Sequence, residues 1–289
     1  MNLIEVKDFL RENINEESEK YFGVTDSKLV ERVTNNWFND QNNYDGRWQK
    51  IIEKVQIVGK VLDMASGCGT FTLFGLQNGY DVWGIEPEKW KREYFKKKVI
   101  ASNYPEEFLK HLVEGVGESL PFDDASFDVV TTYQTLEHVK CVSSCIQEML
   151  RVLKPGGILY IKCPNYDCFF EPHYRILFLP KMNKKLAAKY LKIIGKPTLG
   201  LQTLQWTTEA EIINLLNTNN CIDKVEKLGF LHETKIRHNK IINKLPEFLR
   251  INILVCQIDW LYKLIYKIYK LSKIGRQENH VNLWATKVK

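Results

Sequence analysis

Several features are missing from this sequence of 289 residues, and each absence excludes a class of protein. Its seven cysteines include no Cys-x-x-Cys pair, and Cys141/Cys145 and Cys163/Cys168 do not have the spacing of a zinc knuckle. The odd number of cysteines argues against a disulfide framework, so we expect reduced thiols. The sequence also contains no internal repeat and no low-complexity tract, which excludes a repeat architecture.

Targeting and membrane-spanning signals are also scarce. Residues 1–20 lack the basic start and apolar run of a signal peptide, so we expect a cytoplasmic protein. Asp259 and several lysines interrupt the apolar stretch 251–272, which excludes a transmembrane span there. The amphipathic pattern of 251–272 instead predicts peripheral contact with the inner face of a membrane. The alternative is that it packs against the domain, or against a second subunit in a homodimer.

Charge is unevenly distributed along the chain, although the net charge is only +6. Residues 1–170 contain 20 basic and 26 acidic residues, whereas residues 171–289 contain 21 basic and 9 acidic residues. The basic second part predicts an anionic partner, which could be a phosphate-bearing substrate, lipid headgroups or nucleic acid. No RNA-binding motif accompanies it, so nucleic acid is the least favoured of the three.

The hydrophobic pattern changes near Lys60. From there short apolar runs alternate with amphipathic stretches, which is typical of a parallel sheet covered by helices. We expect an α/β domain over 55–289 behind an N-terminal helical cap at 1–54. Two helical insertions are expected, at 167–206 after the fifth strand and at 234–279 after the sixth. The expected strands are 61–64, 81–85, 112–113, 127–133, 158–162, 221–233 and 281–287.

A glycine-containing loop follows the first expected strand. That strand ends near Asp63 and passes into Gly67-Cys68-Gly69, where the missing side chains let a ligand approach the backbone. Glu86 ends the second strand, where a carboxylate can bind both hydroxyls of a ribose. A nicotinamide or flavin site is disfavoured because its third glycine would fall at Thr72. An acid at position 63 suits a ligand that carries a sulfonium and an ammonium better than one that carries a pyrophosphate.

Five segments in order carry a family resemblance. They are Val61–Gly69, Gly84–Pro87, Gly117–Phe122 with Ser126–Val130, Leu136–Val139 and Leu153–Leu159. Over residues 57–165 the sequence resembles the class I S-adenosylmethionine-dependent methyltransferase superfamily, in particular its small-molecule and surface-glycan methyltransferases. The resemblance implies a Rossmann-like, mostly parallel sheet with strand order 3-2-1-4-5-7-6, and S-adenosylmethionine as the cofactor.

The resemblance also implies which residues bind that cofactor. They are Asp63, Ala65, Gly67, Gly69, Glu86, Pro87, Gly117, Glu118 and Gln134. The sequence departs from the family pattern at two positions. Ala65 replaces the first glycine of the usual loop, and Val116 replaces the Asp that accepts the adenine amino group in many relatives. Adenine recognition is therefore assigned to backbone groups near Gly117 or to Glu118.

The segment after the fourth strand raises the question of a metal. In some relatives a Glu-x-x-Glu-His run there binds a divalent ion. Here Gln134 occupies the first position, which removes one anionic ligand before Glu137 and His138. We therefore predict no metal, and we expect His138 to orient the loop beside the methyl donor.

A hydroxyl acceptor requires a general base, because a free hydroxyl is a weak nucleophile. The candidates follow the fifth strand, on the substrate side of such a sheet, and are Asp167, Glu171 and His173. His173 is the first choice because an imidazole titrates near neutral pH. The predicted catalytic residues are thus His173, Glu171 and His138.

The lysine-rich segment 175–196 has two interpretations, namely a solvated helix face or a positive wall for a phosphate-bearing acceptor. The predicted function is methyl transfer from S-adenosylmethionine to a polar acceptor, a sugar hydroxyl in surface-glycan biosynthesis. One alternative keeps the reaction with RNA or protein as the acceptor. The other is a non-catalytic, membrane-associated scaffold that binds the cofactor weakly or not at all.

Overall fold

A single mixed sheet forms the centre of the molecule. The computed structural model describes residues 2–41, 46–168, 170–228 and 280–289, and its main sheet has the strand order β3-β2-β1-β4-β5-β9-β8. β9 runs antiparallel to both β5 and β8, and the other neighbours are parallel. The predicted Rossmann-like topology and strand order are confirmed. The strands are β1 Val61–Met64, β2 Val82–Ile85, β3 Leu112–Val113, β4 Phe127–Tyr133, β5 Leu153–Pro164, β8 Ile222–Lys227 and β9 His280–Lys287.

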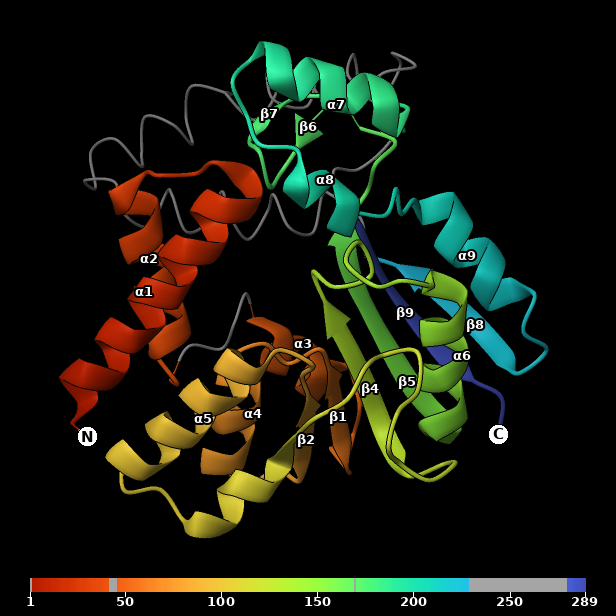
Figure 1. Ribbon diagram of the computed structural model, residues 1–289. Helices are drawn as coiled ribbons and strands as arrows, with labels where there is room; N and C mark the ends of the chain where they lie inside the picture. The colour runs from red at the N-terminus through yellow and green to blue at the C-terminus, as the bar shows by residue number, and fades with distance from the viewer. Residues whose placement is uncertain (1, 42–45, 169, 229–279) are drawn as a thin grey trace, which may run out of the picture.

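Helices cover both faces of this sheet (Figure 1). All four residues of β1 are buried, as expected for a central parallel strand with helices on both sides. One face packs Ile146 of α6 and Ile212 of α9 against the strands, and the other packs Trp48 of α3 and Phe71 of α4. The covering helices are α3 Arg47–Lys54, α4 Thr70–Gln77, α5 Lys89–Ala101, α6 Val142–Val152 and α9 Glu209–Asn217, with the 3-10 turn η2 Glu106–His111 before β3.

Strand β5 begins earlier than the sequence pattern predicts. It extends from Leu153, and its register against β4 shifts between Leu153 and Ile158, where residues 154–157 form a bulge. Gly156 allows the bulge because it has φ 74°. The expected sixth strand, 221–233, corresponds to β8 over Ile222–Lys227, and its end lies outside the described residues.

The first 54 residues contain α1 Leu3–Phe22, α2 Ser27–Phe38 and α3. Asn2 caps α1 in a capping box with Glu5, and the carboxylate of Asp26 accepts two backbone N–H groups at the start of α2. Buried α1 residues, including Leu10, pack in one cluster with Tyr94 of α5. The helical cap is therefore packed against α5.

Residues 165–206 form a second addition, which we call the lobe. It contains the hairpin β6 Phe170–Glu171 and β7 Ile176–Leu177, followed by α7 Lys184–Ile193 and α8 Leu199–Thr203. The sequence predicted helices here but not the hairpin, because two-residue strands have no recognisable period. The lobe contacts the end of α1, where Lys196 Nζ donates to the Gly23 carbonyl at 3.0 Å. The second expected insertion, 234–279, lies outside the described residues.

Candidate active site

The loop after β1 combines three left-handed residues within five positions. Ala65, Gly67 and Gly69 have φ values of 59°, 56° and 75°. Gly69 is the residue before α4, and a Cβ atom there would lie 2.3 Å from the Phe95 ring. Gly67 meets nothing within 4 Å, so its open side is available to a ligand. The positive φ at position 65 explains why glycine is the usual residue there.

Glu86, directly after β2, is fixed to this loop. Its Oε2 accepts the Gly67 N–H at 2.8 Å and its Oε1 accepts the Glu88 N–H at 3.0 Å. Burial raises the pKa of the Glu86 carboxyl, and the nearby Lys91 charge together with these two hydrogen bonds opposes the rise. The carboxylate is thus held in one orientation at the edge of the cofactor cavity.

Asp63 is not available as a free acid. It is 1% exposed and its Oδ1 accepts from Nη1 of Arg47 at 2.8 Å. The Arg47 guanidinium also lies 4.0 Å from the Phe71 ring centre and 4.8 Å from that of Tyr133. Burial raises the pKa of Asp63, and the charge of Arg47 opposes that rise. Arg47 comes from the helical cap, and no sequence motif had marked it.

These groups surround one cavity of about 680 Å³. Eight of the nine predicted cofactor residues line it, namely Asp63, Ala65, Gly67, Glu86, Pro87, Gly117, Glu118 and Gln134. Gly69 does not; it acts through the shape of the turn. The helical cap adds Arg47, Glu17, Tyr21 and Trp37, which the sequence analysis missed. Those four come from helices that carry no family motif, so only the packing of the cap reveals them.

The expected adenine end of the cavity is built from the turn after β3. A Cβ on Gly117 would lie 2.7 Å from Met64 Sδ, so the turn packs closely on β1. Glu118 Oε1 accepts the N–H groups of Lys140 and Cys141 at 2.7 and 3.2 Å. One oxygen of Glu118 therefore holds the loop before α6, and its role toward adenine remains a prediction.

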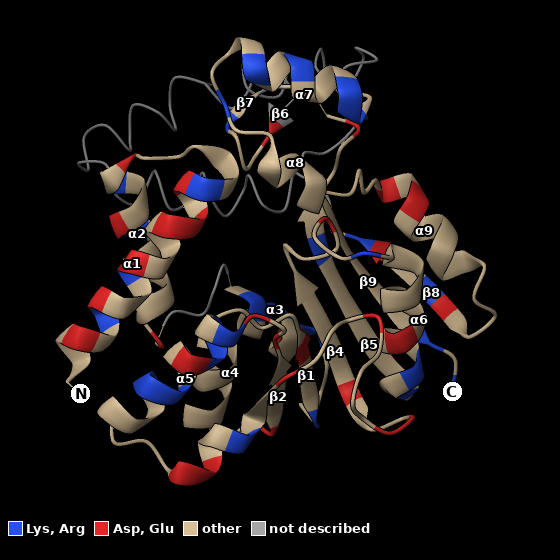
Figure 2. Cartoon of the chain, viewed as in Figure 1, with Lys and Arg blue, Asp and Glu red and all other residues tan. Residues whose placement is uncertain are grey.

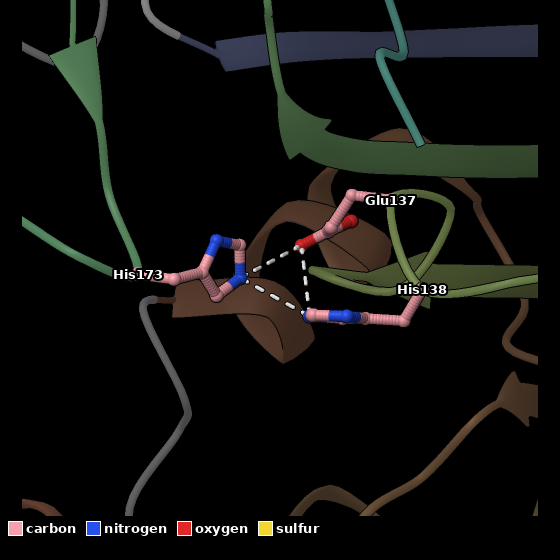
Figure 3. A group of neighbouring side chains, drawn as sticks. All are labelled: Glu137, His138 and His173. Atoms are coloured by element: carbon pink, nitrogen blue, oxygen red, sulfur yellow. Dashed lines mark hydrogen bonds and ion pairs between the residues drawn. The ribbon is translucent and has the colours of Figure 1, made fainter. Parts of the chain in front are cut away.

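Two histidines that line the cavity, His138 and His173, form a cluster with the buried carboxyl group of Glu137 (Figure 3). The Nε2 atoms of His138 and His173 are 3.1 Å apart. Oε1 of Glu137 lies 4.0 Å from the first and 3.9 Å from the second. Glu137 is fully buried, and neither of its oxygens has a hydrogen-bond partner among the described residues.

The surroundings separate the proton affinities of these groups. Burial raises the pKa of Glu137 to about 7. Burial and the neighbouring His173 charge lower the pKa of His138 well below its usual range. For His173 burial alone would lower the pKa, but the hydrogen bond and charge of Glu171, helped by Glu137, raise it above its usual range. His173 is therefore the stronger base of the two imidazoles.

Glu171 lies behind His173 and not on the cavity wall. Its Oε1 accepts from His173 Nδ1 at 2.7 Å and from the Tyr166 hydroxyl at 3.0 Å. Its Oε2 accepts the Tyr174 N–H at 2.6 Å. The third predicted base, Asp167, pairs with Lys181 at 3.4 Å and is not among the lining residues, so the structure does not place it in the site.

The cluster also bears on the metal question. One donor atom from each of Glu137, His138 and His173 lies within 4.8 Å of the others, close enough to hold a metal ion. His173 reaches the cluster from the lobe, which the spacing of the residues around Gln134 could not show. The expectation that the site is metal-free therefore remains a prediction, and it is testable.

Comparison with known proteins agrees with this geometry. A family described as "Methyltransferase domain" matches residues 62–161. Over these residues the chain is similar to class I S-adenosylmethionine-dependent methyltransferases. The methyltransferase domain is 36% identical over 135 residues to the ubiquinone/menaquinone biosynthesis C-methyltransferase UbiE of Shewanella sediminis, covering 43% of this chain and 51% of the relative.

Two further similarities delimit what the comparison shows. The ubiquinone biosynthesis O-methyltransferase of Pseudomonas fluorescens is 33% identical over 116 residues, covering 40% of this chain and 49% of that protein. The chain thus spans about half the length of these curated relatives. The phosphoethanolamine N-methyltransferase 2 of Haemonchus contortus, solved with S-adenosyl-L-methionine, has a TM-score of 0.51 at 17% identity, covering 98% of this chain and 60% of that one. At that identity the last likeness shows the fold alone.

The cavity fits S-adenosylmethionine, the cofactor of this superfamily. Glu86 presents a buried, anchored carboxylate for the ribose hydroxyls, and Gly67 leaves space for the ligand beside it. Arg47 and Asp63 present a paired cation and anion where the methionine portion, with its own carboxylate and ammonium, is expected. The residues present are therefore compatible with the ribose and the methionine portion of the cofactor.

Proposed function

We propose that the protein transfers a methyl group from S-adenosylmethionine to a hydroxyl of a polar acceptor, with His173 as the general base. The observation that carries this proposal is that His173, held by Glu171, lines the same cavity as Glu86 and the loop after β1. The cofactor, when bound, supplies an already activated methyl group, so the chain must align the acceptor and remove one proton.

The hydrogen bonds assign the proton positions in the cluster. His173 Nδ1 donates to Glu171, so in the neutral imidazole Nε2 carries the lone pair and accepts the His138 Nε2–H at 3.1 Å. An acceptor hydroxyl that enters here replaces His138 as the donor to that Nε2. The imidazolium formed on proton transfer is stabilised by the Glu171 carboxylate at 2.7 Å. Glu171 is therefore a positioning residue, as in other base–orienter pairs.

The acceptor class is the less constrained part of the proposal. A sugar hydroxyl, as in surface-glycan synthesis, is the first class to test, because such hydroxyls need a base to react. An acceptor of ubiquinone biosynthesis is the second, since one of the similar proteins is the ubiquinone biosynthesis O-methyltransferase of Pseudomonas fluorescens. Both classes make the same demand on His173, and methyl transfer to either would support O-methylation.

Turnover of His173 variants tests the role directly. With an acceptor found by screening, His173→Ala should lower kcat by about 10²–10⁴ while cofactor affinity stays unchanged. Glu171→Gln should cost less and move the acid limb of the pH profile to lower pH, because loss of the carboxylate lowers the pKa of His173. His111→Gln, a buried histidine bonded to the Val82 carbonyl away from the cavity, is the control. Near-normal turnover by His173→Ala would contradict the assignment.

Metal removal separates this mechanism from a metal-assisted one. If His173 is the base, dialysis against a chelator leaves kcat unchanged and added Mg²⁺ or Mn²⁺ does not raise it. A rate that disappears with the chelator and returns with a divalent ion would contradict the base role, because His173 Nε2 cannot hold both a metal and the proton.

A further inference from the structure

Helix α7 presents a surface that combines positive charge with exposed apolar side chains. Between Glu171 and Glu209 the chain contains no acidic residue, and the basic residues there are Arg175, Lys181, Lys184, Lys185, Lys189, Lys192 and Lys196. Figure 2 shows the consequence, since α7 carries only blue segments whereas α1 and α5 carry both colours. The helix lies at the end of the lobe farthest from α5 (Figure 1).

Some of these lysines already have roles. Lys184 Nζ donates to the Leu204 carbonyl at 2.6 Å, Lys196 bonds to Gly23, and Lys181 pairs with Asp167. Lys185, Lys189 and Lys192 differ, since none of them has an ion pair or side-chain hydrogen bond with the part of the chain that the structure describes.

Large apolar residues lie beside those three lysines. Ile193 is 83% exposed and Leu186 is 59% exposed, while Ala187 and Leu191 of the same helix are buried in the lobe. At 100° per residue, Lys185, Lys189 and Lys192 span about 60° of the outward face, with Lys189 at the middle of that face, and Leu186 and Ile193 lie directly beside them on one side. Leu186 and Ile193 are two turns apart, so they form an apolar strip along the edge of the lysine face.

We propose that this outward face of α7, formed by Lys185, Leu186, Lys189, Lys192 and Ile193, docks the protein on an anionic lipid surface. The lysines complement phosphate headgroups, and the two apolar side chains enter the boundary between headgroups and acyl chains. A soluble phosphorylated ligand would use the lysines but would leave Ile193 and Leu186 in water. Among the described residues no helix is long and apolar enough to cross a bilayer, so the contact is a peripheral one.

Docking by α7 would bring the active-site cavity close to the lipid. Thr203 of α8 and His173 line the cavity, and both belong to the lobe that carries α7. Ala187 and Leu191 of α7 share a buried cluster with Leu201 of α8, so the helix and the cavity wall are packed together. The proposal goes beyond methyl transfer and does not depend on it, because binding is measured without an acceptor.

Vesicle co-sedimentation of the full chain tests the proposal. The probes are vesicles of phosphatidylcholine alone and of phosphatidylcholine mixed with phosphatidylglycerol. We expect binding to the anionic vesicles only, weakening as salt rises. The triple variant Lys185→Gln, Lys189→Gln, Lys192→Gln should lower the partition coefficient on the order of a hundredfold. Leu186→Gln with Ile193→Gln should lower it by about tenfold or more.

Matched variants exclude a general charge or hydrophobicity effect. The charge control replaces three exposed lysines, Lys89→Gln, Lys96→Gln and Lys110→Gln. The apolar control, Ile57→Gln with Ile100→Gln, replaces side chains that are 84% and 59% exposed, and both controls should leave binding unchanged. Circular dichroism and cofactor binding check that every variant remains folded.

Three results would overturn the proposal. The first is the absence of binding to anionic vesicles by the native chain. The second is binding that the α7 variants leave intact, which would place the contact elsewhere in the chain. The third is a dimer in solution that Leu186→Gln with Ile193→Gln dissociates, which would show that a second copy covers this face.

Discussion

The two halves of the cavity are built in different ways. The cofactor half comes from the ends of four strands, β1 to β4, and each predicted residue lies within a few positions of a recognisable motif. The proposed acceptor half brings His138, after β4, together with His173 of the lobe and Tyr21 of the helical cap, and the buried Glu137 lies 4.0 and 3.9 Å from the two histidines. Local sequence therefore fixes the first half, whereas tertiary packing assembles the second.

Arg47 is the exception within the cofactor half, because it comes from the helical cap and no motif marks it, and its removal should have the largest effect. Arg47→Ala leaves the buried Asp63 carboxylate unpaired, so the free energy of unfolding should fall by about 3–5 kcal/mol. Urea denaturation measures the change. Arg11→Ala, which removes an exposed partner of Asp8, should alter stability by less than about 1 kcal/mol. Equal effects for the two variants would show that the cap does not support the cofactor half.

Glu137 provides a second test of the difference between the two halves, because its environment in the acceptor half disfavours a charged carboxylate. The pKa of Glu137 is about 7 in the folded protein, against an ordinary value of 4.5. The neutral carboxyl group therefore contributes its full stabilisation below pH 4.5, and this contribution is lost as the pH rises through 7. Gln is neutral throughout, so Glu137→Gln should raise stability relative to the native chain by about 3 kcal/mol at pH 8 and little at pH 4.5. Denaturant titrations at both pH values test this, with Glu93→Gln on α5 as the exposed control.

The smallest effect concerns the loop of the cofactor half. Ala65 has φ 59°, which costs an L-residue about 1–2 kcal/mol, and glycine avoids that strain at an entropic cost of about 0.5–1 kcal/mol. Ala65→Gly should therefore stabilise the fold by roughly 1 kcal/mol or less and leave cofactor affinity intact. A clear loss of stability in thermal unfolding would mean that the methyl group of Ala65 has a packing role.

The same division explains what the sequence could predict. The strand order and eight lining residues followed from motifs in which glycines and strand-end acids stand at fixed spacings. The pairing of Arg47 with Asp63 could not be foreseen, because 16 positions separate them and α3 carries no motif.

The catalytic candidates show the same limit. Glu171 and His173 were predicted from residue chemistry alone, and the β6–β7 hairpin that brings them to His138 has strands too short for pattern recognition. Asp167, equally plausible as a base by residue type, is turned toward Lys181. Residue type selects candidates, and only the fold of the lobe decides between them.

Calorimetric titration of the native chain and of Glu86→Ala with S-adenosylmethionine tests the central claim most directly. Glu86 anchors the loop after β1 and faces the cavity, so the native chain should bind and the variant should bind roughly tenfold to several hundredfold more weakly. Absence of binding by a folded native chain would contradict the account and favour the non-catalytic scaffold. Binding that Glu86→Ala leaves unchanged would place the cofactor outside this cavity.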